Sequence, residues 1–158
     1  MFYTLFTYPL RKMTQDNHYD YGEPTNVRRG SYLMINDFPC KVVQIAHFKP
    51  GKHGSAKYRF DGVDIFTDKK CVQTFSANDQ IRIPIINKNR YQLINIEDIF
   101  LSLLDDVGDV REDINLPEDP ILRNKIVQAF DDGKLISLTV ISANSNNHRV
   151  IELIEERD

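Results

Sequence analysis

Short runs in which apolar and polar residues alternate dominate the first half of the chain. Alternation with a period of two, or enrichment in β-branched residues, is typical of strands buried on one side. The strands predicted in this way span residues 31–35, 41–46, 56–60, 63–66 and 80–84. Turns are predicted at residues 36–37 and 61–62, so this half is expected to form a small β-barrel.

The second half starts again with strands and contains one predicted helix. Its strands are predicted at residues 91–96, 99–104, 135–141 and 150–154. The helix is predicted over residues 119–130, because Glu118 and Asp119 favour its N-terminus and Gly133 follows its end. About five strands and one helix fit an OB-fold barrel, although an unrelated small barrel fits the pattern nearly as well. The predicted fold class is therefore mainly β.

Charge divides the chain at the same place as the strand pattern. The 158 residues carry a formal net charge of −3. Residues 1–84 contain 12 Lys/Arg and 8 Asp/Glu, whereas residues 85–158 contain 8 Lys/Arg and 15 Asp/Glu. The first part is therefore at +4 and the second at −7. Residues 38–60 contain five Lys/Arg, two His and no carboxylate. An acid-free window of this length favours an anionic partner, and phosphate backbones are the commonest.

Evidence for catalysis or for a membrane span is weak. No apolar run reaches the roughly 20 residues that cross a bilayer. Cys40 and Cys71 belong to no CxxC pair and are interpreted as reduced thiols. His47 and His53 lack further ligands at zinc spacing, and neither a P-loop nor a GxSxG motif is present. We therefore expect a protein that is not an enzyme.

The loop at residues 49–55 lies between two predicted strands and contains a lysine flanked by glycines. Pro50 and Gly51 are a typical turn pair, and Gly54 frees the backbone beyond Lys52. This arrangement is expected to leave the Lys52 side chain exposed to solvent with few neighbouring side chains. Such exposure suits a residue that must enter a narrow pocket or cleft. Taken alone, the loop favours an ordinary exposed lysine in a flexible hairpin.

Residues 49–57, with the core GKHG, resemble the hypusine loop of the eukaryotic translation initiation factor 5A family. Further stretches resemble the same family in the same order, namely residues 64–70, 91–94, 101–104 and 110–117. The resemblance extends from about residue 28 to about residue 142. Pro50, Ser55, residues 71–78 and the chain beyond residue 144 depart from the usual pattern.

The resemblance implies an SH3-like N-terminal barrel followed by a C-terminal OB-fold barrel with one helix. It implies that Lys52 receives an aminobutyl group from spermidine through deoxyhypusine synthase, and that deoxyhypusine hydroxylase completes hypusine. No cofactor is implied, since spermidine is only the donor. The resemblance also implies further residues that belong to the modification loop or face transfer RNA. These are Lys49, Gly51, His53, Gly54 and Lys57.

The family's function is binding to the ribosome beside the P-site transfer RNA. There it promotes peptide-bond formation at stalling sequences such as proline runs, and it assists termination. The implied setting is the cytoplasm, with no membrane partner. The predicted organisation is a flexible extension over residues 1–27, an SH3-like domain over 28–84 and an OB-fold domain over 85–158. The alternatives are a paralogue without hypusine that self-assembles, as in the Woronin body of filamentous fungi, or a general RNA-binding protein.

Overall fold

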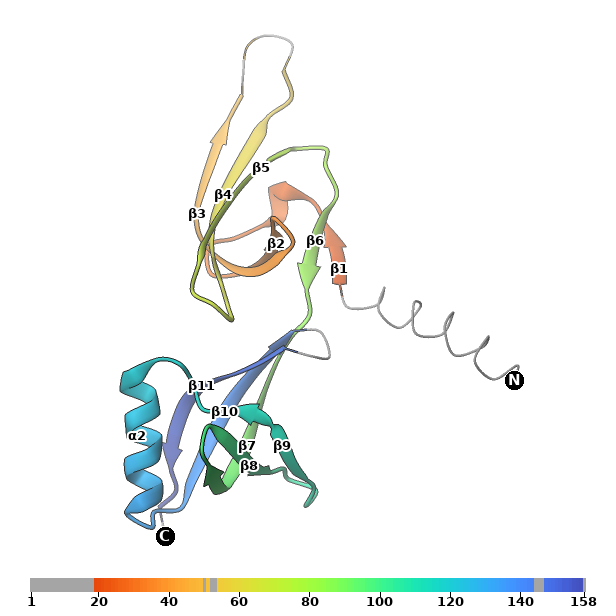
Figure 1. Ribbon diagram of the computed structural model, residues 1–158. Coiled ribbons are helices and arrows are strands. Elements are labelled where there is room, and N and C mark those ends of the chain that lie inside the picture. Colours follow the sequence, from red (N-terminus) through yellow and green to blue (C-terminus); the bar gives the residue numbers. More distant parts are fainter. Residues whose placement is uncertain (1–18, 50, 52–53, 144–146, 158) are drawn as a thin grey trace, which may run out of the picture. The chain divides into compact units, whose positions relative to one another are not determined.

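The computed structural model describes residues 19–49, 51, 54–143 and 147–157. The chain divides into two compact units, unit 1 (Met1–Ile85) and unit 2 (Ile86–Asp158), one residue beyond the predicted boundary. Within the described residues the elements are mainly strands, with a single α-helix in unit 2 (Figure 1). Among the described residues, unit 1 contains two sheets and unit 2 contains one, and each unit has its own hydrophobic core.

Unit 1 is built from two antiparallel sheets. Its strands are β1 (Tyr19–Gly22), β2 (Tyr32–Ile35), β3 (Phe38–Phe48), β4 (Lys57–Asp64), β5 (Lys70–Ser76) and β6 (Ile81–Pro84). Strands β2 to β5 pair in chain order, and β1 pairs with β6. A short 3₁₀ helix, η1 (Pro24–Asn26), connects β1 to the segment before β2. Because β6 also contacts β2, the curled four-stranded sheet closes toward a small barrel (Figure 1).

The core of unit 1 contains alternate residues of these strands. Its buried members are Leu33, Ile35, Cys40, Val42, Phe60, Cys71 and Ile81. Gly62 lies in β4 at the centre of this core, where β3 approaches closely. Asp64 ends β4 and is buried, and its carboxylate accepts a hydrogen bond from the backbone N–H of Phe66 at 2.8 Å. The buried acid therefore organises the turn that leads to β5.

Unit 2 is one five-stranded antiparallel sheet with a helix. Its elements are β7 (Ile86–Glu97), β8 (Phe100–Leu104), β9 (Val110–Asn115), α2 (Pro120–Asp131), β10 (Ile136–Ala143) and β11 (Asn147–Glu155). The strand order is β11-β10-β7-β8-β9, and contacts between β11 and β9 bring the two edges together. Three strands, a helix and two further strands in this order form the predicted OB-fold barrel.

Helix α2 begins and ends as the sequence predicts. The Asp119 carboxylate accepts a hydrogen bond from the Ile121 N–H at 3.0 Å, and Pro120 occupies the first turn, where its missing N–H costs nothing. Gly133 follows the helix with a φ of 73°. The helix places Ile126 and Ala129 in a core that also includes Tyr91, Leu93, Leu101, Leu103, Ile114, Leu116, Ile136, Leu138, Val140 and Val150.

The structure corrects several predicted elements of the chain. The predicted turn at 61–62 is wrong, because β4 runs through it, and the predicted strand at 63–66 ends at residue 64. Strands β1, β5 and β9 have no predicted counterpart. The extension predicted over residues 1–27 is too long, because β1 pairs with β6, whereas residues 1–18 lie outside the described residues.

Candidate functional site

The hairpin of β3 and β4 carries the loop that the sequence singles out. The two strands pair antiparallel up to Phe48 opposite Lys57, and the residues between these two connect them. An irregularity between Val42 and Gln44 breaks the register, which increases the local twist of a strand pair. In Figure 1 the ends of β3 and β4 that lead to the loop lie away from β2 and from the β1–β6 pair.

The structure describes part of the predicted loop. Lys52 and His53 lie outside the described residues. Lys49 is exposed at the end of β3, and Gly54 is half-buried. Gly51 is exposed and has a φ of 66°, a value that glycine adopts without the strain of other residues. Its conformation agrees with the turn that Pro-Gly predicts.

Lys57 belongs to a strand and is held by its neighbours. It is the first residue of β4, and its ammonium group donates a hydrogen bond to the Ser76 hydroxyl at 2.8 Å. The Ala77 N–H donates to the carbonyl of Ala56 at 2.8 Å, so β5 supports this end of the hairpin. The half-buried Lys57 therefore anchors the loop, in addition to contributing a positive charge at its base.

A row of stacked rings stiffens the same hairpin. The His47 and Tyr58 rings are 4.5 Å apart at 13°, and the Tyr58 and Phe60 rings are 6.3 Å apart at 11°. The ring of Phe75 on β5 then lies 6.0 Å from that of Phe60, tilted by 51°. Because Phe60 is fully buried, the row connects the exposed His47 to the core of unit 1. Cross-strand stacking of this kind orders a hairpin.

Positive charge remains available on the hairpin. Arg59 forms an exposed ion pair with Asp61 at 3.2 Å. Lys41 and Lys49 are exposed and form no ion pair with a described residue. The window of residues 38–60 therefore presents at least two lysines to solvent with no carboxylate of its own. Such a surface attracts phosphate groups.

The aromatic residues do not all face a core. Phe60 and Tyr91 are buried, whereas Phe66 and Phe75 are half-buried. Phe100, the first residue of β8, is 51% exposed. Exposure of Phe75 matters because this ring also lines a cavity.

The cysteines and other titratable groups offer no reactive centre in the described residues. Cys40 and Cys71 are free and buried, as interpreted from the sequence. Burial, reinforced by the Cys71 thiol, raises the pKa of Cys40 to about 12. No group of three or more His, Cys, Asp or Glu residues that are described here has the arrangement of a metal site. Likewise, no helix in the described ranges is long and apolar enough to cross a membrane.

Unit 2 contains a polar cluster that sequence reasoning missed. Arg111 donates to both carboxylate oxygens of Asp113, at 2.9 and 2.7 Å, and to the Tyr91 hydroxyl at 3.3 Å. The hydrogen bonds from Arg111 lower the pKa of Asp113. The pKa of His148 is lowered, mainly by burial and secondly by the positive charge of Arg111. The His148 Nε2 atom lies 3.2 Å from Nη2 of Arg111. Because its members satisfy one another, this cluster stabilises the barrel and leaves little capacity for a ligand.

Comparison with known proteins covers most of the chain. The family model "Translation initiation factor 5A-like, N-terminal" matches residues 22–78. The model "Eukaryotic elongation factor 5A hypusine, DNA-binding OB fold" matches residues 85–151. The first match lies within unit 1, and the second covers most of unit 2.

Individual relatives agree with the family models. Eukaryotic translation initiation factor 5A-1 of Arabidopsis thaliana is 42% identical over 118 residues, 74% of this chain and 75% of its own length. The Saccharomyces cerevisiae protein of the same name is 38% identical over 117 residues, 74% of each chain.

Solved structures confirm the two-barrel fold. A translation initiation factor 5A family protein from Naegleria fowleri matches with a TM-score of 0.80 and 34% identity, over 87% of this chain and 99% of its own. The factor from Methanococcus jannaschii matches with a TM-score of 0.70 over 87% of this chain and 96% of its own. At 24% identity this second likeness supports the fold alone. The predicted fold class, an SH3-like barrel followed by an OB-fold barrel, is confirmed.

Proposed function

The chain belongs to the translation initiation factor 5A family, and from this membership we propose that it acts on the ribosome through hypusine at Lys52. It is a translation factor with the family's hypusine domain. The finer proposal is that it binds beside the P-site transfer RNA. There it promotes peptide-bond formation at stalling sequences such as proline runs, and it assists termination.

The place of Lys52 in the sequence, within the segment that connects β3 to β4, carries the proposal. Lys52 directly follows Gly51, whose φ of 66° places a turn beside it. The base of the hairpin is held by the His47–Tyr58 stack and by Lys57. A stacked hairpin whose residues 38–60 include no carboxylate suits a cationic arm that must reach a phosphate-rich cleft. Hypusine lengthens that arm and adds an amine and a hydroxyl, and help with peptidyl transfer then comes from positioning the reacting ends.

The remaining partners follow from the same proposal. Deoxyhypusine synthase would transfer the aminobutyl group of spermidine to Lys52, and deoxyhypusine hydroxylase would add the oxygen. Lys49, His53 and Gly54 would face transfer RNA or the modifying enzymes with the rest of the loop. The protein needs no cofactor and catalyses no reaction of its own in this proposal, and it works in the cytoplasm, where ribosomes are.

Mass spectrometry of the native protein tests the modification directly. We expect the peptide that contains Lys52 to gain one aminobutyl group and one oxygen. Lys52→Arg keeps a positive charge but removes the acceptor amine, so it should abolish support of growth while leaving the fold intact. Lys49→Arg is the matched control and should support growth. An unmodified Lys52, or full growth with Lys52→Arg, would overturn the proposal.

A further inference from the structure

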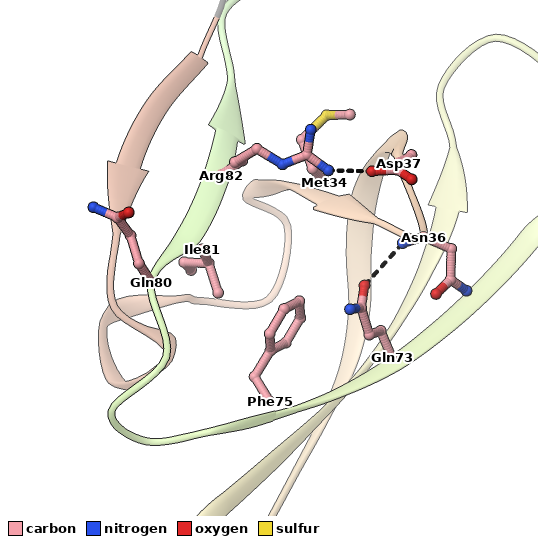
Figure 2. Close-up of a pocket in the computed structure, with 8 residues that line it drawn as sticks. All are labelled: Met34, Asn36, Asp37, Gln73, Phe75, Gln80, Ile81 and Arg82. Carbon is pink, nitrogen blue, oxygen red and sulfur yellow. Dashed lines mark hydrogen bonds and ion pairs between the residues drawn. The ribbon is translucent and has the colours of Figure 1, made fainter.

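A cavity of about 230 Å³ lies in unit 1, between the β2–β3 turn and strands β5 and β6. Its floor is apolar and is formed by Met34, Phe75 and Ile81. Figure 2 shows Phe75 and Ile81 pointing into the middle of this space from neighbouring parts of the chain. The cavity is smaller than the pockets of roughly 300–1,000 Å³ that hold drug-sized ligands. It therefore suits one small planar or branched group.

Amide side chains surround this apolar floor. Asn36, Gln73 and Gln80 all line the cavity. The Asn36 N–H donates to Gln73 Oε1 at 2.9 Å, and Asn36 Nδ2 donates to the Val72 carbonyl at 3.0 Å. These bonds fix the β2–β3 turn to β5 and leave the Gln73 amide nitrogen for a ligand, whereas the exposed Gln80 amide points outward at the rim in Figure 2. An amide offers both a donor and an acceptor, as the edge of a nucleobase requires.

The opposite rim is held by an ion pair. Arg82 on β6 pairs with Asp37 in the β2–β3 turn, as Figure 2 shows, and its guanidinium lies 5.2 Å from the centre of the Tyr19 ring. The pair neutralises the acid nearest the cavity. The pair is exposed to solvent, so it contributes charge balance at the rim and little stability.

The cavity and the loop hairpin share one face of the sheet. Phe75 pairs across the strands with Tyr58, and Tyr58 pairs with His47, so the three side chains project from the same face. All three are at least partly exposed. They form a path of planar groups from the base of the loop to the cavity. Aromatic rings of this kind stack on unpaired nucleotides with little sequence preference.

We propose that this cavity binds the base of an unpaired RNA nucleotide, stacked against Phe75 and hydrogen-bonded to Gln73, with Gln80 at the exposed rim. The inference deepens the proposed function, on which it rests, by giving unit 1 a second RNA contact besides Lys52. An apolar peptide side chain would fill the floor equally well. A base is favoured because it also uses the amide groups and the neutralised rim.

Nuclear magnetic resonance titration of the full chain with adenosine 5′-monophosphate or uridine 5′-monophosphate tests the cavity. Ribose 5-phosphate, which lacks the base, is the matched ligand control. We expect saturable shifts of the Phe75 ring and of the Gln73 and Gln80 side-chain amides with the nucleotides, and much smaller ones with ribose 5-phosphate. Equal shifts with all three, or no shifts at these groups, would overturn the proposal.

Charge substitutions on β5 and beside the cavity provide a second test. Gln80→Glu places a negative charge at the exposed rim and should weaken nucleotide binding several-fold. Thr74→Glu places the same charge on the opposite face of β5, where Thr74 pairs with Arg59, and should leave binding unchanged. Equal weakening by both variants would show general repulsion and refute a localised site.

The test separates this proposal from the proposed function. The titration uses recombinant protein with an unmodified Lys52, so its outcome does not depend on hypusine. In cells, Gln80→Glu should lower growth while mass spectrometry still finds Lys52 fully modified. Normal growth of this variant would contradict the cavity's role and leave the proposal for Lys52 intact.

Discussion

Gly62 lies in β4, where a side chain has no room. A Cβ atom there would be 2.7 Å from Ile35 Cδ1, 2.9 Å from Cys40 Cβ and 3.2 Å from the Lys41 carbonyl oxygen. We expect Gly62→Ala to lower the free energy of unfolding by about 1–3 kcal/mol, because the core must shift to admit the methyl group. Urea denaturation followed by circular dichroism measures this change.

Gly22→Ala is the matched control for this prediction. Gly22 lies in β1, and its added Cβ would meet only the Ile83 side chain, at 2.9 Å from Cδ1. The end of a flexible side chain moves more easily than a buried Cβ, so the loss should be smaller than for Gly62→Ala. Equal stability of Gly62→Ala and the unsubstituted protein would contradict the close packing of β3 on β4.

Cys40 should resist alkylation in the folded protein. Burial, and secondly the hydrogen bond with the Cys71 thiol, raises its pKa from 9.0 to about 12, and the thiolate is the reactive form. We expect iodoacetamide at pH 8 to leave Cys40 unmodified until denaturant is added, as peptide mass spectrometry would show. Rapid alkylation without denaturant would contradict the buried position of Cys40.

The same shift has a consequence for stability at high pH. Below pH 9 the Cys40 thiol is protonated in both the folded and the unfolded chain, so its contribution is constant. Between about pH 9 and 12 the unfolded chain loses this proton first, so stability should fall as pH rises. Cys40→Ala, which has no group to titrate, should flatten this part of the pH profile.

At the scale of elements, the N-terminus of α2 depends on Asp119. Its carboxylate accepts the Ile121 N–H bond at 3.0 Å, and an N-cap acid also interacts favourably with the helix dipole. We expect Asp119→Ala to cost about 1 kcal/mol of stability. Thermal melting measures the cost, and Glu118→Ala, an exposed neighbour with no capping bond, should cost clearly less. A reversed order would place the cap elsewhere.

Elements with a strong local pattern were predictable, and those that depend on distant partners were not. Strand β1 has the sequence YDYG and exists because β6, far along the chain, pairs with it. Strand β9 contains Glu112 and Asp113, which are uncommon in strands, and only Ile114 of this strand is buried. Gly62 was mistaken for a turn, because close packing and chain reversal both require glycine.

The same limit applies to the hairpin that carries the loop. The turn at Gly51 follows from the local Pro-Gly pair, and the sequence predicted it. The stack of His47 on Tyr58 depends on the register of β3 against β4, which a bulge alters. Likewise, the bond from Lys57 to Ser76 joins residues of two strands. Contacts of this kind follow from tertiary structure rather than from periodicity.

At the scale of the whole molecule, the two units differ in core and in charge. Each unit encloses a separate set of buried apolar residues. Residues 1–84 carry a net +4, and residues 85–158 carry −7. A net charge of −3 for the chain therefore conceals a basic unit that is suited to RNA. The acidic unit is expected to make few contacts with phosphate groups.

This difference predicts which lysines determine the salt dependence of ribosome binding. Each phosphate that a lysine neutralises contributes about 0.7–0.9 to the slope of log affinity against log salt concentration. Lys49→Gln removes one exposed cation beside the loop, so it should reduce that slope by about one unit at most and weaken binding at low salt. Lys125→Gln removes an exposed cation from α2 in the acidic unit and should change neither quantity. Sedimentation with ribosomes at several salt concentrations measures both. If both variants reduce the slope of log affinity against log salt concentration by the same amount, phosphate contacts are not confined to unit 1. The acidic unit must then also approach RNA.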